Sequence, residues 1–183
     1  MNWKSRLFAA LLVLPGLVIP TTQADAAAVH GLNSSQIRAV RSLGLKLLVP
    51  GYLPPGFRLV DFQTWADRRG SDNHKAFAYN MVYRGPGKQD FYLCGGEPCG
   101  GCSDNSRAPK HLELKHPLFE YLTLYYWGPF KKGDEQIPVE YSTSHGMILK
   151  GGHNYSFTSP SDETMKAMPE SEVIRVLKHL VLL

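Results

Sequence analysis

The stretch from 47 to 59, which reads LLVPGYLPPGFRL, constrains the fold of this chain more than any other. Each proline fixes its own φ and pushes the residue before it towards an extended conformation, so three prolines exclude a helix here. Gly51 and Gly56 can adopt backbone conformations that are closed to other residues. Because apolar runs stand on both sides, the stretch predicts a rigid corner that leads into a β-sheet.

The first 26 residues have the parts of a cleavable secretory signal peptide. Lys4 and Arg6 precede an apolar run from Leu7 to Pro20, and small residues follow around Ala26. The run is shorter than the roughly 20 residues that span a membrane, although a leader retained as an anchor stays the alternative. We therefore expect residues 27–183 to form a single domain, periplasmic or secreted, with no transmembrane span.

The mature domain is only mildly basic. Without Lys4, Arg6 and Asp25, the 20 basic and 16 acidic residues fall to 18 and 15. Lysine and arginine are scattered rather than gathered in a stripe, which argues against a nucleic-acid partner. A chain of this length is long enough to bury one hydrophobic core.

Helical patterns stand at both ends of the mature domain. Ser34 or Ser35 can cap a short helix, since Ile37 and Val40 recur at helical spacing. Near the C-terminus, Pro169 suits a first helical position, and the apolar stripe that follows predicts docking onto a sheet. That stripe consists of Val173, Ile174, Val176, Leu177, Leu180 and Val181.

Between the helices, alternating patterns predict an antiparallel sheet of about six strands, and hence a single α+β domain with the C-terminal helix on one face. Residues 76–83 and 90–93 read as a hairpin about the turn at 84–88, whereas the polar segment 66–75 reads as a turn. Residues 118–127 are apolar on both faces, which indicates a central strand. The remaining strands are expected at 57–62, 137–142, 147–149 and 155–158.

The corner also carries a resemblance. The letters PGYLPPGFRL at 50–59 are similar to the P-x-YLP-x-GF-x-L opening of a family of extracytoplasmic bacterial domains, found in lipoproteins and in proteins associated with anti-sigma factors. The resemblance implies a meander of strands closed by a helix, located outside the membrane. It transfers no catalytic residue, because members of this family have no assigned activity.

Three cysteines form the one constellation that carries chemistry. Cys94, Cys99 and Cys102 have the C-x4-C-x2-C spacing of three iron–sulfur ligands, but the chain has no fourth cysteine. Zinc is an alternative cofactor, with His111 or His116 completing a tetrahedral set. Redox exchange by the last two cysteines is a further alternative, although loop residues rather than a helix follow them.

A disulfide is the interpretation we favour for this loop, with no metal or other cofactor. Two of the three thiols pair, and Cys94 with Cys99 or Cys94 with Cys102 are the expected bridges. The remaining thiol is buried or pairs with another molecule. Export into an oxidising compartment favours this outcome.

No enzymatic motif emerges, so no catalytic residue is predicted. Ser144 and His145 are neighbours in sequence, and neighbours along a strand point to opposite faces. A G-x-S-x-G elbow and an H-x3-H zinc pair are both absent from the sequence.

Aromatic residues exceed what the core of one sheet face requires. We predict a ligand-binding surface flanked by Trp65 and Trp127, with Tyr125 beside it. The favoured function is therefore an exported non-enzymatic binding module of the bacterial envelope, whose partner is an envelope protein, an extended peptide, a glycan or an acyl chain. The alternative is a thiol-based protein that binds metal or exchanges disulfides through Cys94, Cys99 and Cys102.

Overall fold

The structure is a computed structural model. It describes residues 31–69, 74–97, 110–128, 130–132, 135–137, 140–143, 147–149, 154–160 and 165–183. The predicted leader at 1–26 lies outside these ranges, as do Cys99 and Cys102. Among the described residues, no helix is long and apolar enough to cross a membrane.

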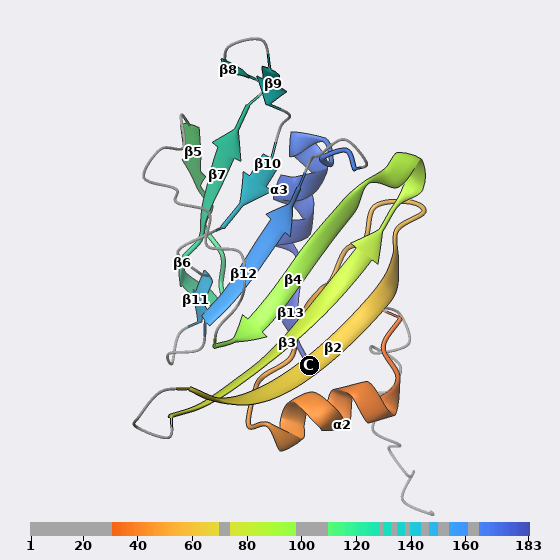
Figure 1. The fold of residues 1–183 in the computed structure, drawn as a ribbon, viewed down its shortest axis with the longest axis vertical. Helices are drawn as coiled ribbons and strands as arrows, with labels where there is room; N and C mark the ends of the chain where they lie inside the picture. Colours follow the sequence, from red (N-terminus) through yellow and green to blue (C-terminus); the bar gives the residue numbers. More distant parts are fainter. Residues whose placement is uncertain are drawn as a thin grey trace, which may run out of the picture.

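A nine-stranded antiparallel sheet dominates the molecule (Figure 1). Its main path runs β2-β3-β4-β12-β10-β7-β5, and β11 and β6 continue from β12. The strands are β2 (Arg58–Arg69), β3 (His74–Arg84), β4 (Asp90–Gly96), β5 (Lys110–Glu113), β6 (Phe119–Tyr121), β7 (Thr123–Trp127), β10 (Glu140–Ser142), β11 (Met147–Leu149) and β12 (Asn154–Ser159). The α+β class with an antiparallel sheet is confirmed, while the expected number of about six strands was too low.

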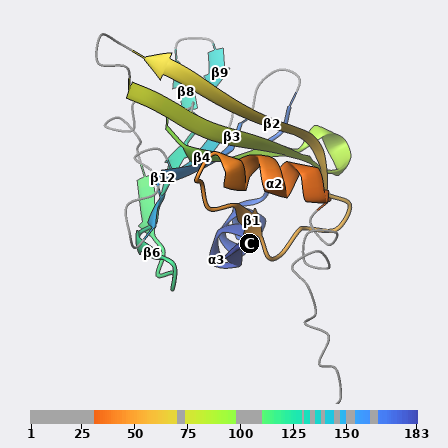
Figure 2. The same cartoon turned by 90° about the horizontal axis from the view of Figure 1, so that it is seen from below.

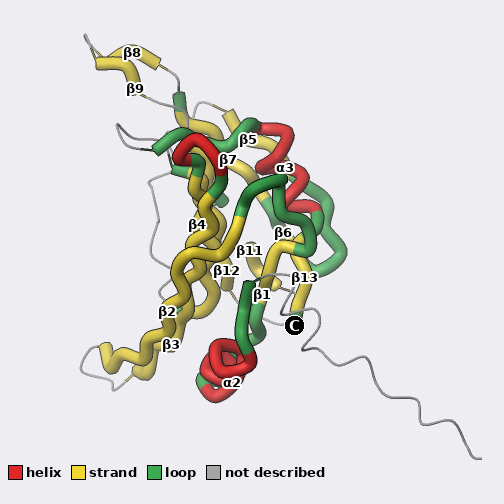
Figure 3. Tube along the Cα trace, turned by 90° about the vertical axis from the view of Figure 1, so that its right-hand side faces the viewer, coloured by secondary structure: helices red, strands yellow, loops and turns green. Residues whose placement is uncertain are grey.

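One face of this sheet is covered, and we call it the inner face. The cover consists of the helices α2 (Ser34–Ser42) and α3 (Glu170–Lys178) and a two-stranded ribbon of β1 (Leu48–Pro50) with β13 (Leu180–Leu182). Figures 2 and 3 show all of them on the same side of the sheet. A separate hairpin of β8 (Phe130–Lys132) and β9 (Glu135–Ile137) projects beyond the sheet. The opposite side of the sheet is the outer face.

Stacked aromatic rings fill the centre of the inner face. Tyr83, Phe91 and Phe157 come from the neighbouring strands β3, β4 and β12. Their ring centroids lie 4.7 Å and 5.4 Å apart, and all three side chains are fully buried. Aromatic pairs of this kind add about 0.5–1.5 kcal/mol beyond the area that they bury.

Three tyrosine hydroxyls on the inner face hold the cover in place. Tyr79 accepts a hydrogen bond from the Leu48 backbone N–H at 2.8 Å, and Tyr155 donates to the Lys46 carbonyl at 3.0 Å. Tyr126 donates to the Glu170 carboxylate at 2.9 Å, and burial is the main cause that raises the pKa of Tyr126 to about 12. Each hydroxyl therefore ties a sheet strand to the layer packed on it.

The proline corner leads into β2, as expected, and it also docks on α3. The Tyr52 hydroxyl donates to Glu172 at 2.9 Å, and the Arg175 guanidinium lies 3.9 Å from the centre of the Tyr52 ring. Gly51 passes so close to His179 that a Cβ would lie 2.5 Å from its carbonyl oxygen, so only glycine fits. Gly56, at φ +82°, completes the tight turn before the strand.

Several predicted boundaries were wrong. The segment 66–75 is not a turn throughout, because β2 extends to Arg69 and β3 begins at His74. Residues 118–127 form two strands, since β6 pairs with β11 while β7 pairs with β10 and β5. The first helix is capped by Asn33, which forms a capping box with Gln36, rather than by Ser34 or Ser35.

The end of the chain also differs from the prediction. Helix α3 ends at Lys178, so Leu180 and Val181 belong to β13 and not to the helical stripe. Leu180 and Val181 have helical spacing in the sequence, but in the structure they pair with β1 as a strand. The local spacing could not reveal this, because strand formation here depends on a partner that is distant in the sequence.

We predict that Tyr79→Phe lowers the free energy of unfolding by about 1–3 kcal/mol, because the buried Leu48 N–H loses its acceptor. Tyr83→Phe is the matched control, since this equally buried hydroxyl on the same strand contacts only the Met81 sulfur, at 3.6 Å. Urea denaturation of both variants measures the difference. Equal losses would show that the Tyr79 hydroxyl does not anchor the ribbon.

Candidate functional site

A row of side chains crosses the outer face from strand to strand. The alternation along β7 defines the face, since Leu124 and Tyr126 are buried inward while Tyr125 and Trp127 point outward and keep partial exposure. Cross-strand register then aligns Val82, Tyr92, Thr158, Ser142, Tyr125 and His111. Hydroxyl groups occupy the centre of this row, and aromatic rings stand on either side of it.

Four of the outward side chains form one patch, which we call the outer-face quartet. On β7 and β10, Trp127 lies opposite Glu140, and Tyr125 lies opposite Ser142. Residues two apart on a strand are separated by about 7 Å, and paired strands by about 4.8 Å. Two aromatic rings, a carboxyl group and a hydroxyl group therefore share a patch about the size of one small ligand.

Two polar atoms of the quartet are buried and have no hydrogen-bond partner in the protein. They are the indole Nε1 of Trp127 and the Oγ of Ser142, the only such side-chain atoms found among the described residues. Buried polar groups are paired in the large majority of cases, and an unpaired one costs about 1–3 kcal/mol. The quartet therefore contains one donor and one hydroxyl group that are free to bond a ligand.

Glu140 adds a third under-used polar group. Its side chain is half-buried, and burial alone raises the pKa of Glu140 above the ordinary 4.5, with no described cation or donor to offset it. A carboxyl group in this state can accept a hydrogen bond or, when protonated, donate one.

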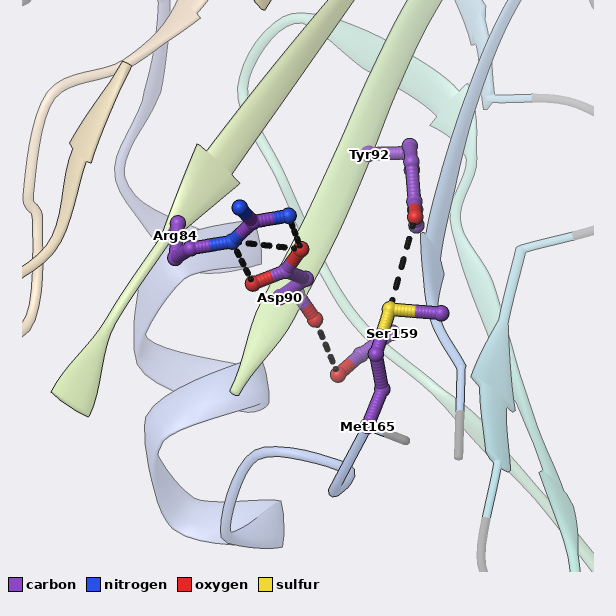
Figure 4. Close-up of polar contacts among 5 residues, drawn as sticks. All are labelled: Arg84, Asp90, Tyr92, Ser159 and Met165. Atoms are coloured by element: carbon purple, nitrogen blue, oxygen red, sulfur yellow. Dashed lines mark hydrogen bonds and ion pairs between the residues drawn. The ribbon is translucent and has the colours of Figure 1, made fainter. Parts of the chain in front are cut away.

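A second polar cluster, at the start of β4, is fully satisfied (Figure 4). Asp90 is completely buried, and Arg84 donates to its carboxylate from Nε at 3.0 and 3.1 Å and from Nη2 at 2.7 Å. The Ser159 hydroxyl donates to the Asp90 carbonyl at 3.0 Å and accepts from the Met168 N–H at 3.1 Å. This cluster fastens the segment before α3 to the sheet and has no buried polar group to spare.

The Tyr92 hydroxyl lies close to this cluster. It stands 3.7 Å from the Met165 sulfur, on the outer side of β4. Tyr92 therefore connects the satisfied cluster with the row that leads to the quartet.

A cleft of about 470 Å³ opens beside β5 and β6. His116 forms part of its wall, accepting from the Leu118 N–H at 3.1 Å and packing 4.9 Å from the Phe119 ring. Burial lowers the pKa of His116 below 6.5 and outweighs the hydrogen bonds to the Leu180 and Lys178 backbone that raise it. The cleft is lined by Glu113, Leu114, Lys115, His116, Phe119, Glu120, Leu122 and Thr123.

The predicted aromatic residues all lie on the outer face but not at one point. Tyr125 and Trp127 are together in the quartet, whereas Trp65 stands opposite Ala78 on β2. Four strands separate β2 from β7, which corresponds to roughly 24 Å across the sheet. Trp65 and Trp127 thus stand at opposite margins of the same face.

The structure places Cys94 and His111 far apart. Cys94 is buried on β4 between Asn80 and Ser156, while His111 lies on the edge strand β5. Three strands intervene, or about 19 Å, whereas zinc ligands lie within about 2.3 Å of a shared ion. Within the described ranges, no three His, Cys, Asp or Glu side chains are grouped to hold a metal. The pairing of Cys94 with Cys99 or Cys102 stays a prediction.

Glu140 and Ser142 did not emerge from the sequence. Both alternate with the inward Tyr141 in a short strand, which indicates only that they point outward. Their role depends on the register of β10 against β7, and no local pattern encodes that register.

Comparisons of the chain with protein-family models, curated proteins and solved structures gave no match.

We predict opposite effects for the same substitution at two fully buried serines. In Ser159→Ala, the Met168 N–H loses the hydroxyl that accepts its hydrogen bond, and the Asp90 carbonyl loses the hydroxyl that donates to it. The free energy of unfolding should therefore fall by about 1–3 kcal/mol. Ser142→Ala removes a hydroxyl that has no partner, so it should leave stability unchanged or raise it by up to about 1 kcal/mol. Urea denaturation of the unliganded protein tests this, and a loss at Ser142 matching that at Ser159 contradicts it.

A second prediction concerns pH. Because the pKa of Glu140 is raised in the folded state, its contribution to stability falls as pH rises through 4.5 towards the folded pKa. Glu140→Gln removes this titration, so the stability of the variant relative to the parent should increase between pH 4 and pH 7. Parallel curves of unfolding free energy against pH would contradict the assignment.

Proposed function

We propose that this protein is an exported, non-enzymatic binding module of the bacterial envelope, and that it binds its ligand on the outer face of the main sheet. The observation that carries this function is the outer-face quartet. Two buried polar atoms without a protein partner lie beside two partly exposed aromatic rings. Ligand sites commonly combine aromatic walls with a few placed polar groups.

The different roles of the two sheet faces support a ligand site on the outer face. The inner face is committed to packing, since α3 and the β1–β13 ribbon are fastened to it by three tyrosine hydroxyls. The quartet lies away from those contacts, on strands that also form the core. A site on strands is held more rigidly than one on loops, so the backbone positions of the four side chains are fixed before a ligand arrives.

Export rests on the sequence. The leader pattern at 1–26 and the resemblance at 50–59 both indicate a location outside the cytoplasmic membrane. An envelope component is accordingly the expected ligand or partner.

The surroundings of Cys94 do not favour the thiol-based alternative. Its side chain is 4% exposed, and reactive thiols are accessible and lie in electropositive surroundings. Its cross-strand neighbours are Asn80 and Ser156, which supply no positive charge. A thiol function would therefore depend on Cys99 and Cys102, outside the described residues.

Tryptophan fluorescence tests the proposed site. After removal of the leader with its Trp3, only Trp65 and Trp127 contribute, so Trp65→Phe leaves Trp127 as the reporter. We expect envelope extract to shift the emission of the Trp65→Phe protein and to leave that of the Trp127→Phe protein unchanged. Mass spectrometry confirms that the leader has been removed. A response confined to Trp65, or no response, contradicts the assignment.

The competing class has its own control. The triple variant Cys94→Ala, Cys99→Ser and Cys102→Ser should fold and retain the fluorescence response. Loss of the response in a variant that folds, as judged by circular dichroism, would favour the thiol-based function instead.

A further inference from the structure

The two orphaned atoms of the quartet specify what a ligand must offer. Trp127 Nε1 is a donor only, so it requires an acceptor. Ser142 Oγ can donate one hydrogen bond and accept others, and the Glu140 carboxyl accepts or donates according to its protonation. These side chains lie within one patch of two paired strands. A matching ligand therefore carries donors and acceptors close together, as hydroxyl groups do.

The rings of Tyr125 and Trp127 add an apolar requirement. They stand two residues apart on β7, point to the same side, and keep partial exposure. They form the partly exposed rim of the patch, and Ser142 Oγ and Trp127 Nε1 lie beneath its surface, so a ligand reaches these two atoms only when the groups that cover them move aside. A ligand seated there needs a face of C–H groups to pack on the rings and polar groups at its edge.

We infer that the outer-face quartet binds a saccharide, with the C–H face of a sugar ring against Tyr125 and Trp127 and its hydroxyls paired with Trp127 Nε1, Ser142 Oγ and Glu140. This inference rests on the proposed function and names the chemical class of its ligand. A sugar supplies both features that the patch requires, an apolar face and closely spaced hydroxyls.

An acyl chain fits the patch poorly. It would cover the rings but pair with neither the indole N–H nor the serine hydroxyl. It would also bury the half-exposed Glu140 carboxyl without a partner, which costs free energy. An anionic group is disfavoured as well, since the quartet contains a carboxyl group and no cation.

An extended peptide that adds a strand is excluded by topology. Strand addition needs an open sheet edge, because the bound peptide pairs with unoccupied backbone groups. The strands of the quartet are internal, since β7 lies between β10 and β5, and β10 lies between β7 and β12. Their backbone groups already belong to the sheet.

The test uses the exported Trp65→Phe protein, so that emission reports Trp127, together with envelope extract of the source organism. The extract is divided into an untreated portion and portions treated with periodate, with protease, or with organic solvent to remove lipid. Periodate cleaves vicinal diols and so destroys the closely spaced hydroxyls through which the inferred sugar is recognised. We expect the fluorescence response to survive protease and lipid removal and to disappear after periodate.

Titration with soluble glycans recovered from the active extract then measures affinity. Ser142→Ala should weaken binding by about tenfold, which corresponds to one lost hydrogen bond. This variant is expected to keep its stability, so a weaker affinity cannot be attributed to unfolding. The Tyr92→Phe variant is the control, because Tyr92 lies on the same row but outside the quartet, and it should bind within about twofold of the parent.

The outcomes separate the two levels of the proposal. A response that survives periodate overturns the inferred saccharide with closely spaced hydroxyls and keeps the binding function. The absence of any Trp127 response to untreated extract overturns both. Unchanged affinity in Ser142→Ala places the sugar elsewhere than on the quartet and overturns the inference.

Discussion

The attachment of the β1–β13 ribbon to the inner face is the constraint on which the rest of the structure depends. The hydroxyl of Tyr79, itself fully buried, accepts from the backbone of Leu48 and so fixes the ribbon against β3. Once the ribbon and α3 are in place, the aromatic stack of the inner face is sealed from water. The packed inner side chains fix the strand backbones, and the backbones in turn fix the positions of the side chains on the outer face.

This arrangement explains why the polar character of the outer face is tolerated. Strands whose inner side chains pack tightly can carry partly unsatisfied groups on the opposite side, since the core stabilises the backbone that positions them. Two buried serine hydroxyls differ in this respect. The Ser159 hydroxyl both donates and accepts a hydrogen bond and so stabilises the fold, whereas the Ser142 hydroxyl has no hydrogen-bond partner in the protein. A buried hydroxyl without a structural partner invites a functional explanation.

The sequence predicted elements whose determinants are local and missed those that are decided at a distance. The hairpin of β3 and β4 was recognisable because its aromatic alternation and its Gly-Pro-Gly turn are neighbours in the chain. By contrast, β1, β5 and β13 have three or four residues each, and their pairing partners alone make them strands. The same distinction holds in the candidate site. Tyr125 and Trp127 were predicted from their residue type, but Glu140 and Ser142 lie beside them only through the register between β7 and β10.

The pairing of Leu48 with Leu182 brings together residues about 130 positions apart. Contacts between such distant segments form late, because the entropy of closing a long loop must be overcome first, and chains rich in them fold slowly. The strand β1 at the start of the proline corner therefore cannot pair until β13, the last element in chain order, is present. The domain is therefore closed only when its last strand in chain order pairs with β1, and every other element must be held open to that partner until then.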